Sequence, residues 1–196
     1  MILTRIEDQR WVRDIEFSPD GNAFYVISEA GLVRRDAISG EILQEYSIEN
    51  GSRLLLTADG QRLIVGGFEH PTVIFDTDSG MLLNRFDLSS QIALNPDETI
   101  LATYNYLDGV ITFWDFDSGE PIGRLTAFAP ETNAMIIFSE DGNQLISAGN
   151  HQLIRWDVPA AMNDTETWIT NNRYIADFTC EQRTFYDIEP LCETDS

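Results

Sequence analysis

Short runs of Asp, Ser and Gly recur along the chain, and their oxygen atoms are of the kind that bind divalent cations. Residues 76–80 read Asp-Thr-Asp-Ser-Gly, and residues 115–120 read Asp-Phe-Asp-Ser-Gly-Glu. A helix-loop-helix calcium loop needs a third ligand at its fifth position, Gly at its sixth and Glu at its twelfth. Here Gly already stands at the fifth position, and the flanking residues favour strands. We therefore interpret both runs as tight turns and predict no metal site.

Residues suited to catalysis do not form a recognisable arrangement. The two histidines, His70 and His151, lie in turns ahead of an apolar strand, whereas a Ser-His-Asp triad needs a His that a carboxylate holds beside an activated Ser. The sequence has no Gly-x-Ser-x-Gly elbow, and without Lys it has no phosphate-binding P-loop. Carboxylates are numerous enough for a glycosidase pair, but they fall in turns. We expect no enzymatic activity and no cofactor.

The charge of the chain limits its partners. The formal net charge is -21, from 33 acidic and 12 basic residues, and every basic residue is Arg. A surface of one sign repels the phosphates of nucleic acids and of anionic lipids. We therefore expect no nucleic acid and no membrane partner, and a protein partner with a basic surface more readily than one with an acidic surface.

The turns belong to a pattern that recurs four times about 40 residues apart, and a period of this size indicates stacked supersecondary units. Each copy has an apolar strand, a polar turn, a second apolar strand and a third strand that ends on Asp. The polar turns begin at Ser18, Thr57, Asn95 and Ser139. The third strands end at Asp36, Asp76, Asp115 and Asp157.

We predict four strands in each of the first three copies and three in the last, because short runs of Val, Ile, Leu and aromatic residues alternate with Gly, Asp and Ser. The predicted strands are residues 12–17, 23–27, 32–36 and 42–46; 52–56, 62–65, 72–76 and 82–86; 92–94, 100–103, 110–115 and 122–125; and 134–138, 144–147 and 153–157. Between third and fourth strands, Gly40, Gly80 and Gly119 follow Ser in tight turns that need a positive φ. The fold class predicted is all-β.

These repeats resemble blades of the WD-repeat β-propeller family. The signature dipeptide stands at Trp114-Asp115 and Trp156-Asp157, and the Ser-Pro-Asp-Gly and Ser-Gly-Glu turns are also similar. The resemblance implies four-stranded antiparallel blades over residues 1–157, at about 12–50, 51–90, 91–126 and 130–157. It departs from the family in lacking the Gly-His pair, and the family's Asp before the third strand corresponds to Asp108 in the third copy and to His151 in the fourth. Of the hydrogen bonds that the family forms inside each blade, we expect one between Thr103 and Trp114 and one between Ser147 and Trp156.

The two ends of the repeat region raise the question of blade number. Residues 2–6 match the fourth-strand segments, so the chain begins on a fourth strand, while the last copy has no evident fourth strand. We favour four blades of a larger ring. The alternatives are that residues 2–6 close a ring of four, or that two chains pair into a ring of eight. An arc that stays open would expose blade faces on both flanks and favour self-association.

The sequence changes character over residues 158–196, where we predict a short helical tail. Asp164 or Thr165 can cap a helix to about residue 177, and residues 179–182 form a capping box ahead of a second helix. The tail resembles the one that closes bacterial multidomain WD-repeat proteins, which implies the C-terminal part of a larger bacterial signalling protein. Cys180 and Cys192 form either a disulfide or two reduced thiols.

The resemblance implies a non-catalytic protein-interaction scaffold or sensor. In such propellers partners bind the loops, and we expect the loop residues Phe68, His70, Tyr104, Tyr106 and His151 to serve as partner-binding anchors, unless they pack locally. The alternative is an enzyme, or a propeller that binds a cation or sugar in an acidic central channel. The start of the chain is not a signal peptide, and no apolar run approaches the ~18 residues of a membrane helix. We therefore expect a cytoplasmic location.

Overall fold

The structure is a computed structural model that describes residues 11–48 and 51–158, except for the side chains of residues 68 and 69. Contacts between residues divide the chain into two units, residues 1–158 and 159–196. The predictions for residues 2–6, for the helical tail and for Cys180 and Cys192 lie outside the described residues. Among the described residues, no helix is long and apolar enough to cross a membrane.

Every described element is a β-strand. The strands are β1 (Val12–Phe17), β2 (Ala23–Ser28), β3 (Gly31–Asp36), β4 (Ile42–Tyr46), β5 (Arg53–Leu56), β6 (Arg62–Asp76), β7 (Leu82–Ser89), β8 (Gln91–Leu94), β9 (Ile100–Asn105), β10 (Val110–Asp115), β11 (Pro121–Thr126), β12 (Ala134–Phe138), β13 (Gln144–Gly149) and β14 (Gln152–Asp157). Their positions agree with the predicted strands to within a few residues at most ends, so the prediction of an all-β fold is confirmed.

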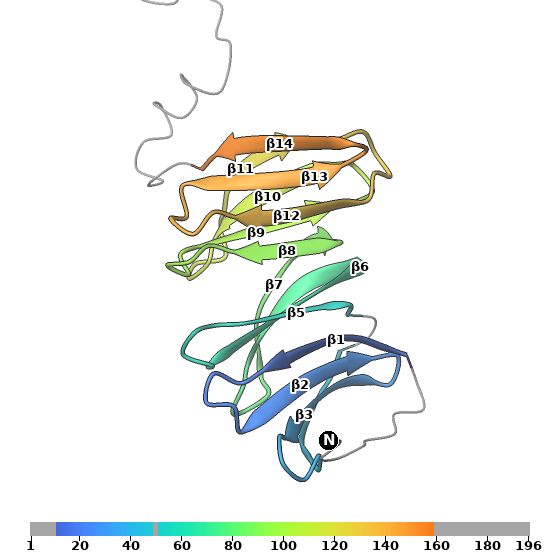
Figure 1. Cartoon of the computed structure of the whole chain (residues 1–196), viewed down its shortest axis with the longest axis vertical. Helices are drawn as coiled ribbons and strands as arrows, with labels where there is room; N and C mark the ends of the chain where they lie inside the picture. The colour runs from blue at the N-terminus through green and yellow to red at the C-terminus, as the bar shows by residue number, and fades with distance from the viewer. Residues whose placement is uncertain (1–10, 49–50, 159–196) are drawn as a thin grey trace, which may run out of the picture. The chain divides into compact units, whose positions relative to one another are not determined.

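The strands form four antiparallel sheets that follow one another in chain order (Figure 1). We call them blades 1 to 4. Blade 1 has the order β1-β2-β3-β4, blade 2 has β5-β6-β7, blade 3 has β8-β9-β10-β11, and blade 4 has β12-β13-β14. Strand β6 spans the two predicted strands at 62–65 and 72–76. A 3.0 Å bond from the Thr77 amide to the Gln61 carbonyl joins its two ends, so β6 doubles back and blade 2 repeats the layout of blades 1 and 3.

In the first turn of each blade, the side chain of one residue forms hydrogen bonds across the turn. In blade 1, the Ser18 hydroxyl donates to Asp20 at 2.6 Å and accepts from the Ala23 amide at 2.9 Å. Thr57 and Ser139 make the same bonds in blades 2 and 4. In blade 3, Asn95 replaces the hydroxyl and accepts from the Thr99 and Ile100 amides. Such local bonds fix the hairpin and therefore the register of both strands.

The second turn of blades 1 to 3 explains why the third strand ends on Asp. Asp76 accepts bonds from both the amide and the hydroxyl of Ser79, and Asp115 does the same with Ser118. The Gly that follows has a φ of 69° at Gly80 and 74° at Gly119. Turn chemistry therefore accounts for the two runs that are similar to calcium loops. Within the described residues, no group of acidic, His or Cys side chains is arranged to hold a metal ion.

The core lies between blades rather than within them. We call the face of a blade that looks toward the preceding blade its near face, and the opposite one its far face. Between blades 1 and 2, far-face residues such as Tyr25 and Leu32 pack against near-face residues such as Leu54 and Val73. The same alternation produces the cluster between blades 2 and 3 and the cluster between blades 3 and 4. A blade therefore buries its apolar faces only when it has a neighbour on each side.

The first strands of the blades line one side of the stack, because β1 packs on β5, β5 on β8 and β8 on β12. Two internal bonds tie the third strand to the second. The Trp114 indole N–H donates to the Thr103 hydroxyl at 2.9 Å, and that of Trp156 donates to the Ser147 hydroxyl at 2.8 Å. Both pairs were expected from the sequence and are confirmed. His151 is exposed, and Asp108 accepts from the Val110 amide two residues along.

Candidate interaction surfaces

The antiparallel order gives the stack of blades two different ends. The turn between first and second strands and the turn between third and fourth strands lie together at one end, which we call the turn end. Backbone bonds prove this proximity, since Ala37 donates to Asn22 at 2.9 Å and Phe116 donates to Thr99 at 2.9 Å. The links between second and third strands, and those between blades, lie at the opposite end, which we call the loop end.

The turn end is uniform and acidic. Hydrogen bonds from Ser18 and Asn22 lower the pKa of Asp20 to about 2. Hydrogen bonds from the neighbouring Ser or Thr and from backbone amides also lower the pKa of five further turn carboxyls. These are Asp36, Asp59, Asp76, Asp115 and Asp141. These carboxylates remain charged well below neutral pH and so keep this end negative.

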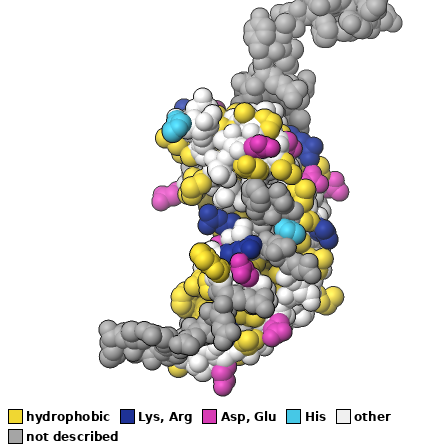
Figure 2. All heavy atoms as spheres, turned by 90° about the vertical axis from the view of Figure 1, so that its right-hand side faces the viewer, with side chains coloured by type: hydrophobic (Ala, Val, Ile, Leu, Met, Phe, Trp, Pro, Cys, Tyr) yellow, Lys and Arg dark blue, Asp and Glu magenta, His cyan; other side chains and the backbone are white. Residues whose placement is uncertain are grey.

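Among the described residues, three ion pairs join neighbouring blades, two of them at turn-end carboxylates and one between the outer strands β7 and β11. Arg34 of blade 1 lies 3.6 Å from Asp78 of blade 2, and Arg62 of blade 2 lies 2.8 Å from Asp117 of blade 3. Arg124 of blade 3 reaches back to Asp87 of blade 2 at 2.8 Å. Part of the Arg content therefore serves the contact between blades. Figure 2 shows charged side chains of both signs among hydrophobic ones on one side of the molecule.

The loop end carries the residues that the sequence suggested as anchors. His70 is half-buried and lines a cavity of about 270 Å³, as do Pro71 and Arg85. Tyr106 is half-buried, and its carbonyl accepts from the Glu131 amide at 2.8 Å. His151 is exposed with a φ of 61°. The side chain of Phe68 lies outside the described residues. These residues stand on different blades and do not form one cluster.

The placement of Tyr104 differs from the expectation. Its side chain is fully buried in the cluster between blades 3 and 4, packed edge-on against Phe128 with ring centroids 6.2 Å apart. Its hydroxyl donates to the Thr132 carbonyl at 2.7 Å. Burial also raises the pKa of this hydroxyl. Tyr104 is therefore a core residue and not part of the loop-end surface. The sequence held a partial signal, because Tyr104 continues the alternation of Ile100 and Ala102, which indicates the face on which it lies but not what covers that face.

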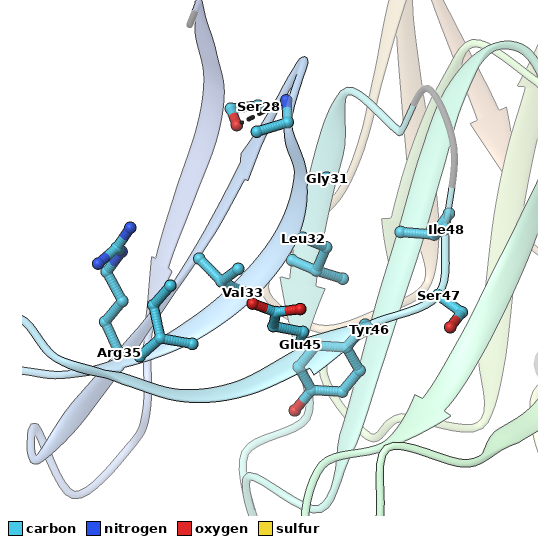
Figure 3. A pocket seen from close by; sticks show the side chains of 11 residues that line it. Ser28, Gly31, Leu32, Val33, Arg35, Glu45, Tyr46, Ser47 and Ile48 are labelled. Carbon is cyan, nitrogen blue, oxygen red and sulfur yellow. Dashed lines mark hydrogen bonds between the residues drawn. The ribbon is translucent and has the colours of Figure 1, made fainter. Parts of the chain in front are cut away.

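The larger described cavity, of about 510 Å³, lies on blade 1 (Figure 3). Figure 3 shows Val33, Arg35 and Glu45 projecting from β3 and β4 beside it. The guanidinium of Arg35 is already bound to the Gly40 carbonyl at 2.9 Å. No residue that lines either cavity comes from the first strands β1, β5, β8 or β12. These cavities are thus not a central channel with polar groups converging from several blades, which a catalytic or sugar site would need.

Two apolar surfaces remain at the flanks of the stack, as expected for an arc of blades. The near face of blade 1 exposes Ile15, Phe17 and Ile42. The far face of blade 4 exposes Met135, Ile137 and Leu153, among others. Isolated exposed apolar residues are ordinary, whereas contiguous patches mark interaction surfaces.

Comparison with known proteins identifies the architecture. No protein-family model matches the chain. The β-propeller domain of Swd1 from Myceliophteria thermophila matches 77% of this chain with a TM-score of 0.67 and 17% sequence identity. The fold is that of a β-propeller. Hydrazine synthase from Kuenenia stuttgartiensis matches 79% of the chain with a TM-score of 0.63 and 19% identity, and this similarity is one of fold alone.

A sequence relative supports the WD40 type of propeller. Cilia- and flagella-associated protein 52 of Chlamydomonas reinhardtii is 29% identical over 158 residues, which cover 74% of this chain. Together with the Trp-Asp ends of β10 and β14, this similarity indicates a WD40-type β-propeller. The chain spans 26% of the length of the algal protein, 55% of the Swd1 chain and 48% of the hydrazine synthase chain.

Proposed function

We propose that the protein is a non-catalytic protein-interaction scaffold that binds a partner at the loop end of its blades. One observation carries the proposal: the frame of the four blades repeats, while the loop end differs from blade to blade. The turn end uses the same Ser or Thr, Asp and Gly contacts in three of four blades. Propellers, like other scaffolds, place variable loops on a rigid frame when they bind partners.

At the loop end, blades 2, 3 and 4 present side chains of different chemical types. Blade 2 contributes His70, which lines a small cavity together with Arg85 and other residues. Blade 3 contributes Tyr106 and the exposed Leu107. Blade 4 contributes His151. Such a mixture of aromatic, apolar and imidazole groups suits recognition of a protein surface, in which a few anchors carry most of the binding energy.

The overall charge narrows the class of partner. A net charge of -21 raises the local concentration of cationic molecules and repels anionic ones over about one Debye length, ~8 Å at physiological salt. The partner proposed is therefore a protein with a basic surface. The chain would serve as the C-terminal, partner-sensing part of a larger signalling protein, as its resemblance to multidomain WD-repeat proteins suggests.

A capture experiment tests the proposal. The purified chain is immobilised and exposed to an extract of the cells that carry the gene, and bound proteins are identified by mass spectrometry. A loop-end variant, His70→Ala with Leu107→Asp and His151→Ala, is compared with a turn-end variant, Asp59→Asn with Asp97→Asn and Asp141→Asn. We expect a basic protein that is lost from the loop-end variant and retained by the turn-end variant, with capture weakening as salt rises. Equal capture by both variants would contradict the proposal.

A further inference from the structure

The near face of blade 1 is built like the near faces of the other blades, but no described blade packs against it. Ile15 stands three residues before the first turn, in the same place as Leu54, Ile92 and Ile136. Those three are buried, whereas Ile15 is 51% exposed. Phe17 is 59% exposed, and the matching Phe138 of blade 4 is buried. The surface is apolar because it has the composition of a buried interface.

The far face of blade 4 shows the opposite half of the same pattern. Leu153 stands four residues before the Asp that ends the third strand and is 79% exposed. The residues at this place in blades 1, 2 and 3 are Leu32, Thr72 and Ile111, and all are buried. Ile137 is 64% exposed, while the matching Ala93 of blade 3 is buried. The strand register places Ile137 beside Ile146, and Met135 beside Ala148 and Leu153, so these side chains form one continuous patch.

The near face of blade 1 and the far face of blade 4 are the two kinds of surface that pack together inside the molecule. Each of the three internal clusters joins the far face of one blade to the near face of the next. Within residues 11–48 and 51–158, one near face, that of blade 1, and one far face, that of blade 4, have no blade packed against them. They are the two halves of one more interface, but within a single chain of four blades each lies at the opposite flank. Val33 and Ile42 of the near face also line the larger cavity, which gives this face a hollow for protruding side chains.

We propose that the flanks are occupied by a second copy of this chain. In this arrangement the far face of blade 4 of each copy packs on the near face of blade 1 of the other, and the two contacts close a ring of eight blades. Two observations support this choice of occupant: every described contact between blades joins a far face to a near face, so the far face of blade 4 matches the near face of blade 1 of a second copy, and the four blades cover about half, 55%, of the Swd1 propeller domain. A head-to-tail contact of this kind must close to avoid open polymers, and two identical copies close it by two-fold symmetry.

The proposal extends the scaffold function proposed above, since it names what completes the frame, but it uses the flanks and not the loop end. The two can therefore fail separately. Capture of a partner through His70, Leu107 and His151 tests the loop end, whereas the mass of the chain in solution tests the flanks.

The test combines light scattering after size exclusion with three Arg substitutions at exposed positions. Phe17→Arg disrupts the near face of blade 1, and Ile137→Arg disrupts the far face of blade 4. Met81→Arg, at a residue 66% exposed directly before the outer strand of blade 2, is the matched control. Circular dichroism verifies that each variant folds. We expect the wild type and Met81→Arg at twice 22.2 kDa, and Phe17→Arg and Ile137→Arg each near 22.2 kDa.

Mixing the two disrupted variants gives the decisive result. The Phe17→Arg chain keeps an intact far face, and the Ile137→Arg chain keeps an intact near face, so the mixture is expected to regain dimers with one intact contact. Recovery on mixing supports the head-to-tail pairing. A monomeric wild type, a dimer unaffected by either substitution, an absence of recovery on mixing, or a polydisperse series of larger species would each overturn the eight-blade ring.

Discussion

The bond between Trp114 and Thr103 allows a sharp test of how the blades are held together. The indole N–H donates to the Thr103 hydroxyl at 2.9 Å, and both side chains are buried. Thr103→Val keeps the shape of the side chain and removes the acceptor. The N–H then stays buried without its partner.

The size of the loss in stability follows from the indole N–H that Thr103→Val leaves without an acceptor. A buried donor that loses its acceptor costs about 1–3 kcal/mol, so Thr103→Val is expected to reduce the free energy of unfolding by that amount. Ser147→Ala removes the equivalent acceptor of Trp156. Its effect is expected to be smaller, because Trp156 is only half-buried and water can reach the freed N–H.

The assay is urea unfolding followed by far-ultraviolet circular dichroism. The matched control is Thr112→Val, which makes the same chemical change at a buried residue directly across the sheet from Thr103 and leaves the indole bond in place. The midpoint should fall for Thr103→Val without a change of slope. If Thr103→Val and Thr112→Val change stability equally, the indole bond does not contribute as argued.

Three further predictions concern the turns and the flanks. Gly21→Ala should reduce the free energy of unfolding by about 1–2 kcal/mol, since φ is 69° and the space around a Cβ is open. Gly109→Ala should reduce it more, because its Cβ would lie 2.1 Å from the Phe128 carbonyl oxygen. Equal losses of stability in urea unfolding would contradict this. The pKa of Asp20 is about 2 when folded and ~3.9 when unfolded, so its contribution to stability is present above pH ~4 and lost as the pH falls through about 2. The difference in stability between wild type and Asp20→Asn should therefore shrink over that range. A constant difference would contradict the prediction. Ile38 stands where blade 2 has Asp78, and Arg155 stands where blade 1 has Arg34, so in the proposed ring Ile38→Asp would face Arg155 of the second copy as Asp78 faces Arg34. The substitution should strengthen dimers by ~0.2–1 kcal/mol per contact at low salt. Analytical ultracentrifugation should show this gain disappear when Arg155→Ala is added.

Much of the fold was predictable because its turns encode it. A hydroxyl or amide that bonds back across the hairpin fixes where each strand begins, and the Asp that caps the second turn marks where the third strand ends. The strands were therefore located closely, and the hydrogen bonds of Trp114 and Trp156 followed from the resemblance to WD-repeat blades. The doubled-back β6 was predicted as two strands, and the structure joins them in one strand of 15 residues whose pairing with β7 shifts register.

The candidate site was harder to predict, because it depends on which face of a strand meets a neighbour. Tyr104 stands between the predicted strand 100–103 and the turn-forming run 105–109, and strand alternation turns it into the cluster between blades 3 and 4. Local sequence cannot show that choice for a residue at a strand end, since the neighbouring blade decides it. The flanks could be anticipated in general terms, yet their individual residues needed the structure, because Ile15 and Ile136 are identical in type and opposite in exposure.

Methionine oxidation measures most directly whether the flank faces are covered in solution. Met135 and Met81 are almost equally exposed in the single chain, at 64% and 66%, but only Met135 lies on a flank face. Both are treated with dilute hydrogen peroxide, and sulfoxide formation is followed by peptide mass spectrometry. If the far face of blade 4 is packed against a second copy, Met135 oxidises several times more slowly than Met81, and the difference disappears in Phe17→Arg. Equal rates in the wild type would contradict the ring of eight blades.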